Sequence, residues 1–232
     1  MADIGNIGAV LFDMDGTLVD SEPMTGPVIR AFCLENGIAD ADYQWTEFYG
    51  VTWQHVARRI AADHLRNANI PDMAARLHGI WLNMCMESPP APIPGAPEAV
   101  REAHARVPTA IVSSAYRESI DLTVQQLGLA DCVTCRVGAE DYGKSKPAPD
   151  GFLHAAEVLQ VAPESCLVFE DSLAGIESAR AAGMKVIAIT HRSNVAERAA
   201  QLADRAISDF AMLEDGFFDT IRRSPQSSCD SR

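Results

Sequence analysis

The sequence predicts an α/β protein in which a doubly wound parallel sheet is interrupted, after its first strand, by an all-helical insertion. Short apolar runs alternate with amphipathic stretches over residues 97–189, which is typical of repeated β–α units. Residues 20–88 instead contain only helical patterns. They end in a proline-rich stretch, 88–97, which holds five of the thirteen prolines and is expected to be a stiff, hinge-like linker.

Five apolar runs are expected to form the strands of the sheet. Most of them lack charged residues, as strands covered on both faces usually do. In chain order, the expected strands are 9–12, 109–112, 132–137, 166–169 and 186–189. Parallel strands need crossover connections, so helices are expected between them. The expected helices are 97–105, 117–127, 150–160 and 173–182.

Capping residues mark the ends of several of these helices. Asp150 and Ser172 stand where N-caps are expected, because their side chains can accept hydrogen bonds from free amides. Gly128 and Gly183 stand where helices are expected to end in the left-handed conformation.

The insertion is expected to form a domain of its own. Its expected helices are 22–36, about 43–49, 53–65 with Thr52 as N-cap, and 72–86. The expected division is a core domain of residues 1–19 and 89–224, a helical domain of residues 20–88, and a flexible tail of residues 225–232.

The charge of the chain excludes some partners. The 232 residues carry a formal net charge of −13, and the pI is about 4.8. Such a chain repels nucleic acid and anionic membranes, so neither is expected as a partner, and no obligate protein partner is evident. Lysine occurs only at positions 144, 146 and 185. A bound phosphate would therefore need a metal ion or a few well-placed cations.

The expected location is the cytoplasm. No apolar run approaches the roughly 20 residues that span a bilayer, and the N-terminal segment Met1–Ile4 lacks the features of a signal peptide. The six cysteines are scattered, which favours reduced thiols over a disulfide framework. Cys132 and Cys135 match a CxxC spacing but lie in an expected strand, and we interpret them as structural.

Two acids follow the first expected strand directly. Asp13 and Asp15 would be partly desolvated and would repel each other there, so a compensating positive charge is needed. Mg²⁺ suits such a site, because it prefers oxygen ligands and leaves room for a phosphate. Gly16 permits a sharp turn, and Thr17 supplies a hydroxyl. Two solvated acids before a turn would show the same local pattern.

Chemically active residues also follow the other expected strands. Ser113 and Ser114 end the second, Lys146 follows the third, and Glu170 and Asp171 end the fourth. Ligands of open parallel sheets bind beyond the carboxyl ends of the strands, at the switch point in strand order. A phosphoryl-transfer site accounts for all of these residues together.

These segments resemble the motifs of a known family, the haloacid dehalogenase superfamily, and within it the phosphatase and β-phosphoglucomutase-like branch. Four motifs occur in order, at Asp13–Ser21, Ser113, Lys146–Asp150 and Glu170–Ile176. The resemblance covers nearly the whole chain. It implies a Rossmann-like core and assigns residues 20–88 to a helical cap.

The resemblance also implies roles for individual residues. Asp13 would attack phosphorus and form an aspartyl-phosphate, and Asp15 would act as general acid and then as general base. Ser113 and Lys146 would hold the phosphoryl oxygens. The implied Mg²⁺ ligands are Asp13, the Asp15 backbone carbonyl, Glu170 and Asp171, and the residues expected to bind substrate are Gly16, Thr17, Ser113, Ser114, Lys146, Tyr49 and Trp53.

The expected function is an Mg²⁺-dependent phosphatase of a small phosphorylated metabolite, with a sugar phosphate favoured. Tyr49 and Trp53 could stack on a sugar, although packing within the cap explains Trp53 equally well. A β-phosphoglucomutase-like mutase is one alternative. The family's mutases have a histidine, a lysine and an arginine where this chain has Thr25, Tyr49 and Trp53. A second alternative is a receiver-like signalling module, which would instead carry its acceptor Asp two strands after the acid pair.

Overall fold

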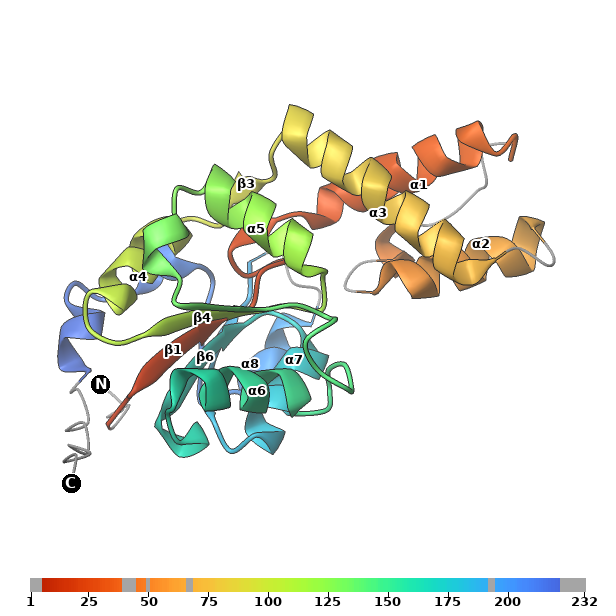
Figure 1. Ribbon diagram of the computed structural model, residues 1–232. Coiled ribbons are helices and arrows are strands. Elements are labelled where there is room, and N and C mark those ends of the chain that lie inside the picture. The colour runs from red at the N-terminus through yellow and green to blue at the C-terminus, as the bar shows by residue number, and fades with distance from the viewer. Residues whose placement is uncertain (1–5, 39–44, 49–50, 66–68, 192–194, 222–232) are drawn as a thin grey trace, which may run out of the picture. The chain divides into compact units, whose positions relative to one another are not determined.

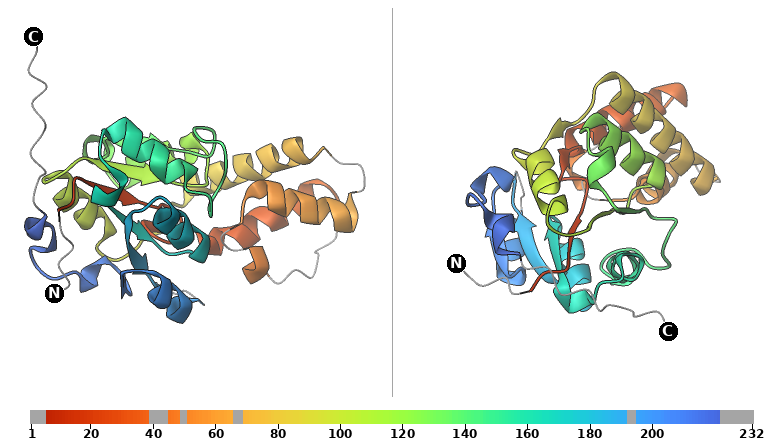
Figure 2. Two further views of the ribbon diagram at one scale, coloured as in Figure 1. Left: turned by 90° about the horizontal axis from the view of Figure 1, so that it is seen from below. Right: turned by 60° about the vertical axis from the view of Figure 1, so that its left-hand side comes forward.

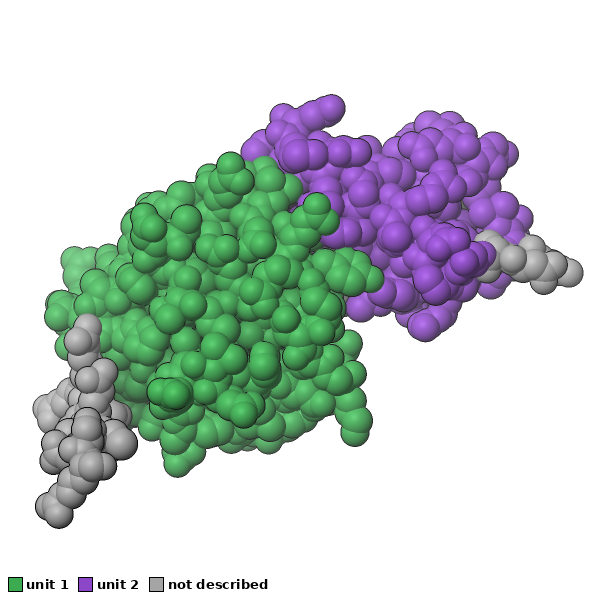
Figure 3. All heavy atoms as spheres, viewed as in Figure 1, with its two compact units in different colours: residues 1–19, 92–232 green, residues 20–91 purple. Residues whose placement is uncertain are grey.

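The computed structural model describes residues 6–38, 45–48, 51–65, 69–191 and 195–221 (Figure 1). Internal contacts divide the chain into two compact units (Figure 3). One unit contains Met1–Val19 and Pro92–Arg232, and the other contains Asp20–Ala91.

The first unit is built on a six-stranded sheet whose paired strands all run parallel. Its strands are β1 (Ala9–Phe12), β4 (Thr109–Val112), β5 (Cys135–Val137), β6 (Cys166–Glu170), β7 (Lys185–Ile189) and β8 (Arg205–Ile207). They lie in the order β5-β4-β1-β6-β7-β8. From β1 the chain adds β4 and β5 on one side, and it then crosses to the other side of β1, where it adds β6, β7 and β8. The switch point lies between β1 and β6, where doubly wound folds bind their ligands.

Helices cover both faces of this sheet (Figures 1 and 2). On one face lie α4 (Ala96–His104) and α5 (Arg117–Gln126), and on the other lie α6 (Asp150–Leu159), α7 (Leu173–Ala181) and α8 (Ala196–Leu202). Each face has its own apolar core. Val10 and Phe12 of β1 point into the first core, whereas Leu11 points into the second, because successive side chains of a strand alternate. The predicted doubly wound α/β core is confirmed.

An aromatic cluster closes the first of these cores. Phe12 of β1 stacks on Phe169 of β6, with ring centroids 5.3 Å apart. Three phenylalanines of the C-terminal segment pack on Phe169 or beside it: Phe210 in the 3₁₀ helix η5 (Phe210–Met212), and Phe217 and Phe218 in η6 (Phe217–Thr220). The segment after β8 therefore covers the sheet beneath the switch point.

Most element boundaries lie within two residues of the expected ones, and the main differences are a displaced start of one strand and one additional strand. Strands β1 and β4 have the expected bounds. Strand β5 begins at Cys135 rather than at residue 132, because the 3₁₀ helix η3 (Ala130–Cys132) precedes it. The Thr109 hydroxyl donates a hydrogen bond to the Cys132 carbonyl and so holds this turn against β4. Strand β8 was not expected, since its three residues, Arg205–Ile207, form no apolar run.

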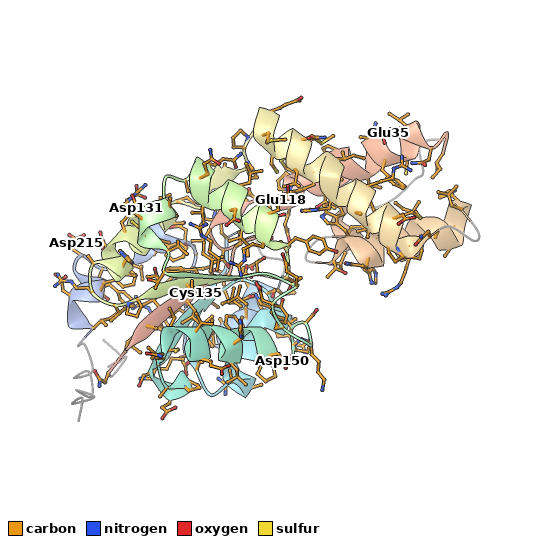
Figure 4. The ribbon with its side chains drawn as sticks, viewed as in Figure 1. Glu35, Glu118, Asp131, Cys135, Asp150 and Asp215 are labelled. Atoms are coloured by element: carbon orange, nitrogen blue, oxygen red, sulfur yellow. The ribbon has the colours of Figure 1, made fainter. Side chains whose placement is uncertain are left out.

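The predicted caps are confirmed with one exception. The side chains of Thr52 and Ser172 accept hydrogen bonds from backbone amides in the first turns of α2 (Trp53–His64) and α7. Gly128 and Gly183 have positive φ angles of 63° and 78° after α5 and α7. The N-cap of α6 is Pro149, so the prediction of Asp150 as a cap is wrong. Asp150 begins the helix (Figure 4), and its Oδ1 accepts a hydrogen bond from the amide of Lys144.

The second unit is helical throughout its described part. It contains η1 (Glu22–Met24), α1 (Thr25–Glu35), η2 (Trp45–Phe48), α2 and α3 (Ile70–Glu87). The helix expected over 22–36 thus begins with a 3₁₀ turn, and only 45–48 of the segment expected as a helix over about 43–49 lies within the described helical residues. Helix α3 packs on both α1 and α2, and the three long helices each contribute a fully buried side chain, Phe32, Ile60 and Leu77.

The chain passes between the units twice, in two very short strands. Strands β2 (Val19–Asp20) and β3 (Ala91–Pro92) pair as a two-stranded sheet. Beside it, the amide of Ile93 donates a hydrogen bond to the carbonyl of Leu18 at 2.9 Å. The expected tail, 225–232, lies outside the described residues. Within the described part of the chain, no helix combines the length and apolar character needed to cross a membrane.

Candidate active site

Side chains from both sides of the switch point meet at the carboxyl edge of the sheet. Asp13 directly follows β1, Glu170 is the last residue of β6, and Asp171 follows it. One carboxylate oxygen from each of these three acids lies within 4.8 Å of the others. Asp13 is held in place by its backbone, because its amide donates a hydrogen bond to the Phe169 carbonyl of β6. The sequence motifs predicted this convergence.

Lys146 lies between two of these acids. Its Nζ donates hydrogen bonds to Asp13 Oδ1 at 2.5 Å and to Glu170 Oε1 at 2.7 Å, and it also reaches the Val112 carbonyl at 3.3 Å. Its side chain is only 9% exposed, and the ammonium lies over the ring of Phe152. Lys146 is therefore held inside the site by two buried carboxylates.

The environment shifts the pKa values of this buried pair. Burial raises the pKa of Asp13 to about 8, with Glu170 and Asp15 adding to the rise and Lys146 opposing it. For Lys146, burial alone lowers the pKa, but the carboxylates of Asp13 and Glu170 outweigh it and raise the pKa above its ordinary value. Lys146 therefore remains charged. One ammonium faces four acids, counting Asp171, so the site favours an additional cation.

A cradle at the start of α7 holds Glu170 in place. Its Oε2 accepts hydrogen bonds from the Ser172 amide at 2.6 Å and from the Ser172 hydroxyl at 3.0 Å, while Oε1 accepts from Lys146. Gly175 supplies the space, because a Cβ at that position would overlap the Glu170 carboxylate. Glu170 is buried, at 1% exposure, and both of its carboxylate oxygens accept hydrogen bonds.

The turn after β1 places Asp171 in a similar way. Gly16 has a φ of 83°, and a Cβ there would overlap the Asp171 carboxylate. The Thr17 hydroxyl donates a hydrogen bond to Asp171 Oδ1 at 3.3 Å. Gly16 and Thr17 were expected to contact substrate, and the structure shows both of them against Asp171. Asp15 lies at the same turn and forms a bridge with Val19.

Ser113 follows β4 and is almost fully buried, at 2% exposure. Its amide donates to the Val137 carbonyl of β5 at 3.0 Å. Its Oγ accepts a hydrogen bond from the Ala115 amide at 3.0 Å. Ser114 follows it and is partly exposed. The Val112 carbonyl, one residue before Ser113, contacts Lys146, so Ser113 belongs to the same edge as the acids.

Two expected substrate contacts belong to the second unit. Tyr49 lies outside the described residues. Trp53 begins α2 and is partly buried. Sequence reasoning did not single out Gly175 or Tyr142, although Gly175 lies within the motif Glu170–Ile176. Tyr142 had no signal beyond its position four residues before Lys146.

The donor set fits a hard divalent cation. Asp13, Glu170 and Asp171 offer only carboxylate oxygens, which Mg²⁺ prefers, and no softer ligand joins this cluster among the residues that the structure describes. Both oxygens of Glu170 already accept hydrogen bonds, but a carboxylate has about four acceptor positions and can still bind a cation. The arrangement combines a carboxylate, a fixed ammonium and a hydroxyl, which suits phosphoryl transfer.

Comparison with known proteins gives the family. Residues 7–183 match the model of the haloacid dehalogenase-like hydrolases. The chain is 30% identical to the fructose-1-phosphate phosphatase YqaB of Escherichia coli over 179 residues, 77% of this chain and 94% of that protein. It is 30% identical to the bifunctional riboflavin kinase/FMN phosphatase of Arabidopsis thaliana over 182 residues, 78% of this chain, but spans only about half (48%) of that protein.

A solved structure shows the same fold. CbbY from Rhodobacter sphaeroides, in complex with phosphate, superimposes with a TM-score of 0.80 over 89% of this chain and 96% of that one, at 23% sequence identity. The resemblance predicted from the four motifs is confirmed, and the chain belongs to the haloacid dehalogenase-like hydrolase family.

Proposed function

We propose that the protein is an Mg²⁺-dependent phosphatase that hydrolyses a small phosphorylated metabolite, with a sugar phosphate as the favoured substrate class. The observation that carries the proposal is the position of Lys146 between Asp13 and Glu170, at the switch point of the sheet. A buried ammonium beside a nucleophilic carboxylate provides a place for phosphoryl oxygens. The similarity to a fructose-1-phosphate phosphatase along nearly the whole length of that relative supports the substrate class.

Asp13, Glu170 and Asp171 would hold the Mg²⁺ ion, together with the backbone carbonyl of Asp15. When bound, the ion would offset the charge on the phosphoryl oxygens and on the carboxylates around them. This matters here because the chain places a single ammonium among the acids of the site and carries a net charge of −13. The cytoplasm remains the proposed location.

In the first half-reaction, Asp13 attacks phosphorus and forms an aspartyl-phosphate while the bond to the leaving oxygen breaks. Asp15 donates a proton to that oxygen. In the second half-reaction, Asp15 takes a proton from water, the water oxygen attacks phosphorus, and Asp13 leaves as a carboxylate. Lys146 and the Ser113 hydroxyl hold the phosphoryl oxygens in both steps.

The alternatives differ in the phosphoryl acceptor or in the role of the chain. A mutase would pass the phosphoryl group to a second sugar hydroxyl rather than to water, and this remains an outcome of the test below. The receiver-like module is not supported, because the chain belongs to a hydrolase family and its second acid pair ends β6. Tyr49 and Trp53 remain proposed substrate contacts.

Phosphate release from a panel of phosphorylated sugars and from p-nitrophenyl phosphate tests the proposal. We expect turnover with Mg²⁺ and loss of turnover with a chelator. Asp13→Asn should lower kcat by about 10³-fold or more, because an amide cannot serve as the nucleophile. Circular dichroism should show that the variant is folded. Near-native turnover by folded Asp13→Asn, or full activity in excess chelator, would overturn the proposal, and sugar-phosphate isomerisation without phosphate release would identify a mutase.

A further inference from the structure

A short loop connects two parts of the site that come from different strands. We call residues 138–142 the clamp loop; it follows β5 and leads toward Lys146. The clamp loop is hydrogen-bonded to residues 113–117, which connect β4 to α5. The bonds run from the Ala139 amide to the Ala115 carbonyl at 2.9 Å, from the Arg117 amide to Glu140 Oε1 at 2.9 Å, and from the Arg117 guanidinium to Asp141 Oδ2 at 2.6 Å.

The last residue of the clamp loop reaches the site itself. The Tyr142 hydroxyl donates a hydrogen bond to the carbonyl of Ser113 at 3.1 Å. Its ring lies against Gly151 in the first turn of α6, where a Cβ would come within 3.1 Å of the ring. Burial raises the pKa of Tyr142, while a hydrogen bond with the Ser114 side chain opposes the rise. The phenol therefore stays protonated at neutral pH and remains a hydrogen-bond donor.

This contact completes the restraints on Ser113. Its amide is bonded to β5, its Oγ accepts from the Ala115 amide, and its carbonyl accepts from Tyr142. Because a hydroxyl has one proton and two acceptor positions, the bond from Ala115 leaves the Ser113 proton available for donation. No acceptor for that proton is found within the described part of the chain.

The end of the clamp loop and the nearby Lys146 thus contact two consecutive carbonyls at the end of β4. Lys146 Nζ reaches the carbonyl of Val112, and the Tyr142 hydroxyl reaches that of Ser113. These two donors, Tyr142 and Lys146, are four residues apart in the chain and therefore set the position of the Ser113 peptide relative to the Lys146 ammonium. Phosphoryl transfer is sensitive to this spacing, because both groups must contact oxygens of one phosphoryl group.

We propose that Tyr142 is a positioning residue of the site, whose hydroxyl fixes the Ser113 peptide so that the serine hydroxyl faces the phosphoryl group that Lys146 also holds. The proposal rests on the phosphatase function proposed above. Tyr142 contacts Ser113 and acts through it, rather than through the substrate.

Tyr142→Phe removes the hydroxyl and keeps the ring, so it is the direct test. With p-nitrophenyl phosphate and Mg²⁺, we expect kcat to fall about tenfold and KM to change less than twofold, because the Ser113 contact gains strength in the transition state. The affinity for orthovanadate, which resembles that state, should fall by a similar factor. In a Ser113→Ala background the same substitution should have no further effect on kcat.

Thr109→Val provides a matched control. The Thr109 hydroxyl also donates to a backbone carbonyl, that of Cys132, but at the opposite end of β4. We expect this variant to lose thermal stability and to keep kcat and vanadate affinity.

Three outcomes would overturn the positioning role: kcat of Tyr142→Phe within twofold of the unmodified protein, an equal loss of kcat in the Ser113→Ala background, or an equal loss of kcat in Thr109→Val. If the unmodified protein shows no phosphatase activity, the proposed function itself fails, which is a distinguishable result.

Discussion

Replacing Gly175 with alanine tests the hydrogen-bonded cradle around Glu170, because the cradle and ordinary helix propensity predict opposite changes in the free energy of unfolding. Gly175 lies in the first turn of α7, and alanine is normally favoured over glycine in a helix by about 1 kcal/mol. The structure predicts instead that alanine at this position lowers the stability of the protein. A Cβ at this position would overlap the carboxylate of Glu170, which is buried and accepts hydrogen bonds from Lys146 and from the amide and hydroxyl of Ser172.

The expected magnitude follows from those bonds. A hydrogen bond to a charged group contributes about 1.5–3 kcal/mol to stability. Displacing the Glu170 carboxylate breaks at least two such bonds, a loss of about 3 kcal/mol or more. After subtracting the helical gain, we expect Gly175→Ala to lower the free energy of unfolding by about 2 kcal/mol or more.

Urea unfolding followed by circular dichroism, in the presence of a chelator, measures this difference. Gly79→Ala is the matched control, because Gly79 lies within α3 and, beyond its own helix backbone and chain neighbours, no atom of the described residues lies within 4 Å of the position its Cβ would occupy. We expect Gly79→Ala to stabilise the protein by about 0.5–1 kcal/mol. If Gly175→Ala is as stable as the unmodified protein or more stable, the account of the Glu170 cradle is wrong.

Two further predictions concern the core and the nucleophile. Phe169 is fully buried and packs on Phe12 and Phe210. Phe169→Ala should therefore lower the free energy of unfolding by about 3–5 kcal/mol. A loss below about 1 kcal/mol in urea unfolding would contradict this packing. In the folded protein the pKa of Asp13 is raised from its ordinary value of 3.8 to about 8. Between pH 4 and pH 8 the folded state therefore binds a proton at Asp13 that the unfolded state has lost, and the folded state loses stability as the pH rises through this range. Asp13→Asn abolishes that titration. In the presence of a chelator, the free energy of unfolding of Asp13→Asn relative to that of the unmodified protein should therefore rise from pH 4 to pH 8 by at least about 1.4 kcal/mol, which corresponds to one pKa unit. A difference that stays constant or falls over this pH range, in thermal or urea unfolding, would refute the prediction.

Local patterns predicted the parts of the fold that bury continuous apolar runs. Strands β1 and β6 have no polar residue in their interiors; Asp13 directly follows β1, and Glu170 ends β6. The order of the strands then placed those acids at one edge, because parallel strands share a carboxyl side. For the same reason, the sequence could predict that Lys146 belongs to this edge.

Other features depend on contacts that a linear pattern does not contain. The β8 strand, Arg205–Ile207, is short and partly polar, and it forms by pairing with β7. The start of β5 was misplaced because a turn held by Thr109 competes with the extended conformation. The bond from Tyr142 to Ser113 joins two loops 29 residues apart, and neither loop has a periodic signal that would reveal the other.

The central claim is that Asp13 becomes phosphorylated during turnover, and trapping the intermediate tests it most directly. Asp15→Asn should slow the second half-reaction, whereas p-nitrophenolate needs no proton to leave, so the aspartyl-phosphate should accumulate. With p-nitrophenyl phosphate and Mg²⁺, we expect a rapid burst of about one p-nitrophenolate per protein. Borohydride reduces an acyl phosphate to an alcohol, so tandem mass spectrometry should then find homoserine at position 13. Hydrolysis without a burst and with Asp13 unmodified, or a phosphoryl group on another residue, would contradict the account.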